Sequence, residues 1–269
     1  MQKIEQIANQ VFADGFSVRQ AARNGSLVRP TSGMAPGFQQ GNIVILSAPD
    51  ADEFLRFCVL NPKTAPILDV SEPGDFTLPR LGREIDIRTD VPRYRIFRDG
   101  ELIDSVVDLR AIWSGDLVTF VLGCSFSFED ALVRASIPVR HMDNGTNVPM
   151  YVTNLDTVPS GKFGGPTVVS MRPFVPKDAI MATILSSQLP QAHGAPVHFG
   201  DPAAIGIKDI AAPEFGDAPE IRDGEIPVFW ACGVTPQLAI MRAKPRIAIT
   251  HEPGHMLVTD LRSDGGRQF

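Results

Sequence analysis

The chain has 269 residues, of which 43% are hydrophobic and 21% charged, a balance typical of a globular protein with a sizeable core. Its formal net charge is -6 and it has no cluster of Lys and Arg, which argues against nucleic acid or an anionic membrane as a partner. No apolar run approaches the ~18 residues of a membrane span, and Met1–Gln6 lack a secretory signal, so we expect a cytoplasmic protein.

The cysteines do not form a recognisable pairing or metal-binding pattern. Cys58, Cys124 and Cys232 are an odd number and contain no CxxC pair. We therefore expect free thiols in a reducing compartment, and neither a disulfide framework nor a zinc knuckle.

The first part of the chain alternates helical and strand patterns. Residues 3–13 and 17–23 have helical spacing, and a Pro/Gly-rich stretch follows. Residues 42–46 and 67–70 read as strands, with a helix over 51–59 between them. This order predicts a parallel crossover.

A hairpin and a long irregular tract follow. Residues 93–97 and 102–107 are predicted to pair across Asp99-Gly100. Residues 167–172 read as a strand and 177–187 as a helix. The tract 190–224 is rich in Gly and Pro, and we expect it to be functional because long irregular stretches often carry sites.

Two stretches about a hundred residues apart carry nearly the same pattern. Residues 124–135 and 232–243 align without a gap, and each follows an apolar run with a thiol, a hydroxyl three residues later and helical spacing. Each copy is therefore predicted to be a strand, a tight turn and a helix start. Residues 150–154 and 256–260, MYVTN and MLVTD, form a second matching pair.

These turns are candidate anion sites, because a helix that begins at Ser or Thr presents free backbone N–H groups and the positive end of its dipole. We expect the copies to lie side by side in one domain and to hold one carboxylate-bearing ligand. The alternative is that short strand–turn–helix units resemble one another by chance. The predicted substrate-binding residues of the repeat are Ser125, Ser127, Asn154, Gly233, Thr235 and Asp260.

Cys124 and Cys232 open the two helices and are candidate catalytic residues. A helix N-terminus lowers a thiol pKa and favours the thiolate. The alternative is that each thiol is simply a small buried hydrophobe.

The remaining candidates lie outside the repeat. His193 and His198, in a loop with two glycines and two prolines, are candidate general acids or bases, unless this is an ordinary surface loop. Arg140 and Arg172 follow apolar segments, where a guanidinium can hold a carboxylate at two points, although most arginines are only solvated. No dinucleotide, Walker or serine-hydrolase motif occurs.

Residues 251–255, HEPGH, have the spacing of the zinc-protease H-E-x-x-H motif. Pro253 and Gly254 oppose the helix that would place both imidazoles on one face. We therefore predict no metal site here, while either His251 or His255 remains a candidate acid or base.

Several strings together resemble the D-glutamate cyclase family, and the resemblance covers nearly the whole chain. They are residues 61–63, 90–94, 123–129, 147–151, 193–202, 229–236 and 251–256. The resemblance implies an α/β protein with a three-layer α/β/α domain and a smaller α+β domain, and a hydro-lyase without a known cofactor. We assign residues 1–142 and 218–269 to the main domain and 143–217 to the smaller one.

The reaction that the family name implies is cyclisation of D-glutamate to 5-oxo-D-proline with loss of water. The enzyme must hold the α-carboxylate, move protons from nitrogen to the leaving oxygen and stabilise an oxyanion. The repeat turns suit the anion-holding roles. One of His193, His198 and His255 suits proton transfer.

Two other functions remain open. Two thiols on related units are what a cofactor-independent racemase or epimerase needs, with one cysteine on each face of the substrate. A non-catalytic protein that binds small carboxylates is the third reading. In each case the expected partner is a small carboxylate, no cofactor is required, and a homo-oligomer is left open.

Overall fold

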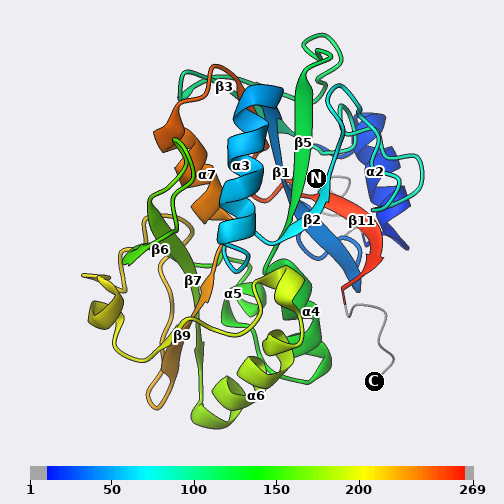
Figure 1. Cartoon of the computed structure of the whole chain (residues 1–269). Helices are drawn as coiled ribbons and strands as arrows, with labels where there is room; N and C mark the ends of the chain where they lie inside the picture. Colours follow the sequence, from blue (N-terminus) through cyan, green and yellow to red (C-terminus); the bar gives the residue numbers. More distant parts are fainter. Residues whose placement is uncertain (1–10, 264–269) are drawn as a thin grey trace.

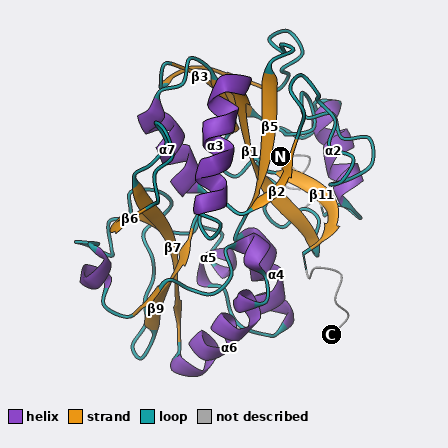
Figure 2. Cartoon of the chain, viewed as in Figure 1, coloured by secondary structure: helices purple, strands orange, loops and turns teal. Residues whose placement is uncertain are grey.

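The computed structural model describes residues 11–263. It is an α/β protein with one seven-stranded and one four-stranded sheet, and the paired strands within these residues are all antiparallel (Figures 1 and 2). Residues 3–10 of the first expected helix lie outside the described part, and residues 11–13 are not helical. Within residues 11–263, no helix is long and apolar enough to cross a membrane.

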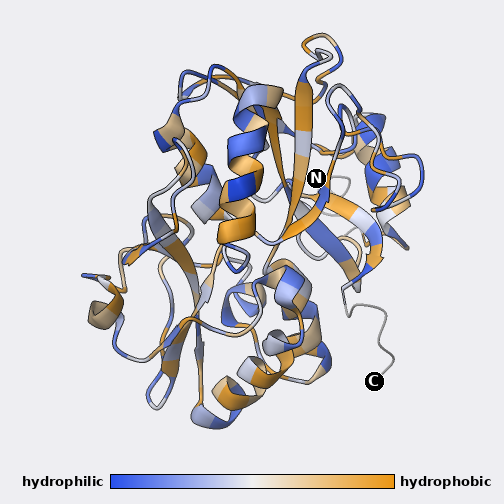
Figure 3. Cartoon of the chain, in the orientation of Figure 1, coloured by the Kyte–Doolittle hydropathy of each residue, from blue (hydrophilic) through white to orange (hydrophobic). Residues whose placement is uncertain are grey.

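The larger sheet is built around β5 (Leu117–Gly123), which is buried along its whole length. Figure 3 shows this strand as mainly hydrophobic. The strand order is β2-β5-β1-β10-β3-β4, and β11 also pairs with β1. The other strands are β1 (Phe38–Ser47), β2 (Ile67–Val70), β3 (Tyr94–Arg98), β4 (Glu101–Val106), β10 (Ala248–His251) and β11 (Leu257–Arg262).

The predicted hairpin is confirmed as β3 and β4. The predicted parallel crossover is also found in β1, α3 and β2, although the two strands do not pair directly. β1 and β2 are both antiparallel to β5, so they run in the same direction with β5 between them. The apolar strand β5 has its backbone partners on both sides, which separates the two strands that the helix connects.

The smaller sheet has the order β6-β7-β9-β8. Its strands are β6 (Met150–Asp156), β7 (Pro166–Phe174), β8 (His198–Phe199) and β9 (Ile226–Ala231). We had expected residues 226–231 in the main domain. They instead pair with β7 over six residues, so β9 belongs to the smaller sheet.

The helices divide between the sheets. They are α2 (Gly15–Arg23), α3 (Ala48–Leu60), α4 (Phe126–Arg134), α5 (Arg140–Asp143), α6 (Pro176–Ser187) and α7 (Val234–Ala243), with 3-10 turns η1 (Pro190–Ala192) and η2 (Pro202–Ile205). α3 and α7 pack on one face of the larger sheet through Phe54, Phe57 and Ile240. The other face is covered largely by residues of the irregular segment 78–91, not by a helix layer.

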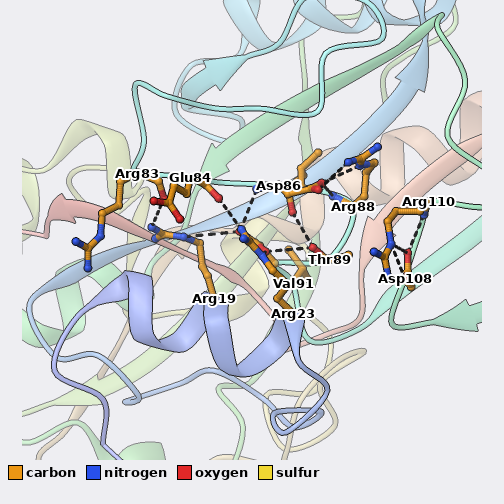
Figure 4. A network of polar contacts seen from close by, with 12 residues as sticks. Arg19, Arg23, Arg83, Glu84, Asp86, Arg88, Thr89, Val91, Asp108 and Arg110 are labelled. Carbon is orange, nitrogen blue, oxygen red and sulfur yellow. Dashed lines mark hydrogen bonds and ion pairs between the residues drawn. The ribbon is translucent and has the colours of Figure 1, made fainter.

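A polar network attaches α2 to residues 83–90, beside the larger sheet (Figure 4). Asp14 caps the helix by accepting from the Ser17 backbone N–H at 2.8 Å. Arg23 donates from Nε and Nη2 to the two oxygens of the buried Asp90, each at 2.8 Å. Arg19 donates to the Val258 carbonyl at 2.7 Å, which ties the same helix to β11. These bonds position α2 and are remote from the cavity described below.

The repeat extends well beyond the motifs visible in the sequence. The order β11-β1-β5-β2 in the larger sheet corresponds to β6-β7-β9-β8 in the smaller one. Equivalent hydrogen bonds recur, since Thr153 Oγ1 donates to Thr167 O at 2.7 Å and Thr259 Oγ1 donates to Gln39 O at 2.8 Å. The strands of the two strand–turn–helix units, β5 and β9, thus belong to different sheets.

The two units exchange their helices. α4 follows a strand of the larger sheet, yet Phe128 and Leu132 pack with Phe174 and Trp230 of the smaller one. α7 follows a strand of the smaller sheet, and its Ile240 packs on the larger one. Because each unit crosses from one sheet to the other, both turns lie at the junction of the two sheets.

Candidate active site at the junction of the two sheets

Both repeat turns open into one cavity of about 490 Å³. We call it the junction cavity. It is bounded by the two turns, α7, the β3–β4 hairpin, the segment before β11, and the chain at 147–150 and 215–216. Its polar or charged lining residues are Asn42, Arg95, Cys124, Ser125, Asn147, Cys232, Gln237, Thr250 and His251.

The two turns have the same geometry. Ser125 and Gly233 precede their helices with helical backbone angles. Ser127 N–H donates to Cys124 O at 3.1 Å, and Thr235 N–H donates to Cys232 O at 3.0 Å. Each thiol therefore sits at the start of a helix, near the backbone N–H of Phe126 or Val234. The structure brings Cys124, Ser125, Cys232 and Gly233 together at this cavity.

The thiols are not activated in the way that their position predicts. Burial raises the pKa of Cys124 to about 12, and outweighs the lowering by the Phe126 N–H. Burial also raises the pKa of Cys232, against the N–H groups of Val234 and Gly233. Both side chains are thus neutral thiols at pH 7. A negative charge on Cys232 would also raise the pKa of Cys124.

Asn42 connects the two turns. Its Nδ2 donates to the carbonyl of Gly123 at 2.8 Å, at the end of β5. The same side chain lies directly against Gly233, where a Cβ atom would overlap it. Glycine at 233 therefore lets the second turn approach the first.

His251 is a hydrogen-bond donor held toward the cavity. The Ile43 N–H lies 3.1 Å from its Nδ1 and the Ile43 carbonyl oxygen lies 3.5 Å from the same atom, and the shorter contact favours the neutral tautomer with Nδ1 as acceptor and the proton on Nε2. Nε2 lies 3.5 Å from the side-chain amide of Gln237, another lining residue. Burial lowers the pKa of His251 to about 4, and the ring is therefore neutral at pH 7.

Among the described residues that line the cavity, Arg95 is the one with a charged side chain. It lies on β3 opposite Thr250. Its Nε is 4.0 Å from Glu252 Oε2, and that oxygen also accepts from Ser105 Oγ at 2.7 Å. The cation is only loosely paired and half-buried, so it is free to meet an anion in the cavity.

Two predicted hydroxyls hold the turns from behind. The Val168 N–H donates to Thr235 Oγ1 at 2.9 Å, and the Gln40 N–H lies 3.4 Å from Ser127 Oγ in the equivalent position. Neither hydroxyl lines the cavity. These contacts attach the first turn of each helix to the sheet that contains the preceding strand.

Arg172 lies beneath the first turn in a buried ionic network. It donates to Glu129 and, from Nη2, to Ser125 Oγ at 3.1 Å. His141 Nε2 lies 3.3 Å from Glu129 Oε1. Burial alone would raise the pKa of Glu129, but Arg172 and then His141 hold it at about 2. Arg172 thus positions Ser125 from outside the cavity.

The three histidines predicted for proton transfer do not line the junction cavity. His193 is buried near the β5–α4 turn, with Nδ1 2.9 Å from Lys63 O. His198 is on β8, with Nε2 2.7 Å from Asp201 O. His255 lies between carbonyl oxygens of Pro253 and Val28. Each ring has a backbone carbonyl oxygen within hydrogen-bond distance, and none of the three rings lines the cavity.

Three further predicted substrate ligands also lie elsewhere. Arg140 pairs with Glu225 and Glu220 at a separate shallow cavity. Asn154 is exposed on β6 beside Gly206. Asp260 lies 2.9 Å from Arg19 Nη1 in the network that holds α2. Their contacts are structural in this conformation.

Residues 251–255 do not form the helix of a zinc-protease site. His251 ends β10, and residues 252–256 are irregular. The His251 ring faces Ile43 and Gln237, whereas His255 faces Pro253 and Val28. Among the residues that the structure describes, no group of three or more His, Cys, Asp or Glu could hold a metal ion.

Sequence reasoning missed Asn42, Arg95 and Gln237 as cavity residues. Asn42 carried a usable signal, because it is the polar residue of the predicted strand 42–46, whose other residues are apolar. His251 was a possible acid or base from the sequence, but the sequence did not place it beside the thiols. Arg95 and Gln237 follow ordinary strand and helix spacing, and only the tertiary structure brings them to the thiols.

The chain belongs to the D-glutamate cyclase family, whose profile matches residues 118–260. It is 58% identical over 256 residues to a protein of Verminephrobacter eiseniae named "Putative hydro-lyase", covering 95% of this chain and 93% of the relative. Relatives with the same description are 59% identical in Bordetella pertussis, covering 92% and 89% of the two chains, and 56% identical in Azorhizobium caulinodans, covering 94% and 93%. The predicted family membership is confirmed.

Proposed function

We propose that this protein is a hydro-lyase that removes water from a small amino or hydroxy acid in the junction cavity. The observation that carries the proposal is that Cys124 and Cys232, from the two repeat units, line one cavity. The family and the names of its relatives support the class of reaction. The specific reaction to test first is the cyclisation of D-glutamate.

That cyclisation needs proton transfer but no net acid or base. The amine nitrogen forms a bond to the side-chain carboxyl carbon, and one carbon–oxygen bond of that carboxyl breaks. The ammonium nitrogen gives up two protons, and the leaving oxygen receives both and departs as water. A group that gives a proton at oxygen while taking one at nitrogen completes the transfer.

The thiols are suited to that exchange. A thiol that gives and takes a proton in one step need not persist as a thiolate, which agrees with sulfur atoms whose pKa burial raises. Cys124 and Cys232 lie on the two turns, so each can serve a different atom of the substrate. We assign them the proton transfer.

His251 and Arg95 supply the electrostatic part. Because Ile43 occupies Nδ1, His251 presents Nε2–H as a donor for the oxyanion that forms at the attacked carbon. Arg95 is available for the carboxylate that does not react. Asn42 and Ser125 keep the two turns at their mutual distance through Gly123 and Arg172.

A two-thiol racemase is the second candidate, favoured by the same pair of cysteines at one cavity. It requires one thiolate to remove the Cα proton and one thiol to return a proton from the opposite face. The raised pKa of Cys124 opposes this mechanism in the empty cavity.

The deciding experiment is NMR of the pure protein with D-glutamate, L-glutamate and small hydroxy acids in heavy water. A hydro-lyase gives a dehydrated product, a racemase gives deuterium at Cα with the opposite enantiomer, and a binding protein gives neither. We expect Cys124→Ser and Cys232→Ser to lower water loss, since the hydroxyl is a far weaker acid. Cys58→Ala, on the buried face of α3, should retain it. Water loss at the wild-type rate in both cavity variants would exclude the assigned roles.

A further inference from the structure

The junction cavity changes from polar to apolar along α7. The helix lines it with Val234, Gln237, Leu238 and Met241, which recur at the spacing of one helix face. From Val234 to Met241 that face is about 10 Å long at a rise of about 1.5 Å per residue. Its first turn adjoins Cys232, and its far end presents Met241.

Strand β3 shows the same gradient in the same direction. Arg95 and Phe97 both line the cavity and, being two residues apart, lie on one face of the strand. Arg95 is opposite Thr250, next to His251, whereas Phe97 is nearer the hairpin turn. That turn meets the end of α7, because a Cβ at Gly100 would lie 3.2 Å from Met241 O. The apolar ends of the strand and the helix therefore coincide.

The charge in the cavity is small. Arg95 is its charged lining residue within the part of the chain that the structure describes, and Glu252 stands 4.0 Å from it. One partly compensated cation matches one carboxylate. A second carboxylate at the Phe97 and Met241 end would lose water without gaining a partner.

We infer that the substrate is a monocarboxylic acid with an apolar substituent, which lies along α7 with its carboxylate near Arg95 and its apolar end between Phe97, Leu102 and Met241. This inference rests on the proposed function for the reacting end and adds the class of substrate. A cavity of about 490 Å³ falls within the ~300–1,000 Å³ range of pockets that enclose drug-sized ligands. D-Glutamate would occupy only the polar end.

Isothermal titration calorimetry of the full chain tests the inference with butanoate, hexanoate, octanoate, adipate and D-glutamate. We expect affinity to rise about threefold for each added methylene, on the scale of apolar burial. Hexanoate should bind more tightly than adipate, which has the same chain length and a second carboxylate. An affinity that does not change with chain length, or tighter binding of adipate, would overturn the inference.

Matched variants locate the effect. Met241→Gln keeps the length of an exposed side chain. It should reduce at least threefold the ratio by which the affinity for octanoate exceeds the affinity for hexanoate. Met181→Gln on α6, also exposed and remote from the cavity, should leave that ratio unchanged. Equal effects of the two variants would contradict the proposed position of the apolar end.

These outcomes are separate from those of the hydro-lyase proposal. Tight binding of long monocarboxylates with no water loss from any hydroxy or amino acid would support the substrate class and refute the hydro-lyase. Efficient water loss from D-glutamate, with no dependence of affinity on chain length, would support the hydro-lyase and refute the substrate class.

Discussion

Glu129→Gln tests whether the buried network beneath the first turn stabilises the fold. The carboxylate is 2% exposed, and its charge partner Arg172 is 1% exposed. The amide keeps the shape of the side chain and removes its charge. Arg172 then becomes a buried cation whose remaining polar contacts are Ser125 and Ser170 hydroxyls.

The size of the effect follows from the pKa of Glu129. A decrease from 4.5 to about 2 corresponds to ~3 kcal/mol of stability at neutral pH, at about 1.4 kcal/mol per unit. Loss of one partner of a buried ion pair costs about 3–5 kcal/mol, which agrees in scale. We therefore expect the free energy of unfolding at pH 7 to fall by ~3 kcal/mol.

The direction of the pKa shift predicts how the stability difference between the two proteins changes with pH. Because the folded-state pKa is depressed, the contribution is complete above the unfolded-state value of 4.5 and is lost as the pH falls toward about 2. Urea unfolding of both proteins should show a difference that shrinks over this window. The titrations of His193 and His251, which make no hydrogen bond or ion pair with Glu129, occur in both proteins and cancel. Glu220→Gln, at an exposed ion pair with Arg222, is the control and should change little. A difference below ~1 kcal/mol at pH 7, or one that is constant from pH 5 to 3, would refute the reasoning.

Three substitutions and one chelation treatment test the cavity. His251→Phe removes the Nε2–H donor, so kcat should fall about 100-fold, while the wild-type rate should show no ionisation of this ring between pH 5 and 8 because its pKa is about 4. Asn42→Ala removes the donor to Gly123 O and should lower the free energy of unfolding by ~1–3 kcal/mol; a smaller loss would mean that water replaces the amide. Gly233→Ala should cost ~1–3 kcal/mol in the same unfolding assay, because the added methyl meets Asn42, and unchanged stability would show that the turns can separate. Exhaustive chelation should leave water loss unaltered, and activity that disappears and returns with added zinc would contradict a metal-free reaction.

Local patterns account for much of the fold. Helices α3 and α6, the β3–β4 hairpin and both strand–turn–helix units follow from periodicity and turn residues, which act between neighbours in the chain. The similar turns at Cys124 and Cys232 were visible for the same reason. Family membership was also evident from specific strings.

The partners of these elements were not predictable from local patterns. The apolar run of β9 predicts a buried strand but not its partner, and its pairing with β7 is known only from the structure. For the same reason the loop histidines seemed suitable for catalysis. Hydrogen bonds to Lys63 O and Asp201 O occupy His193 and His198, and such contacts form between residues that sequence spacing does not relate.

The sequence by itself determined the family, the local elements and the pair of matching turns, because each depends on residues close together in the chain. The tertiary structure decided that the units exchange helices between two sheets, which brings the turns to one cavity with Asn42, Arg95 and His251. It also decided the ionisation of the site. Burial outweighs the helix N-terminus at both thiols, and the extent of burial is set by packing from the whole chain.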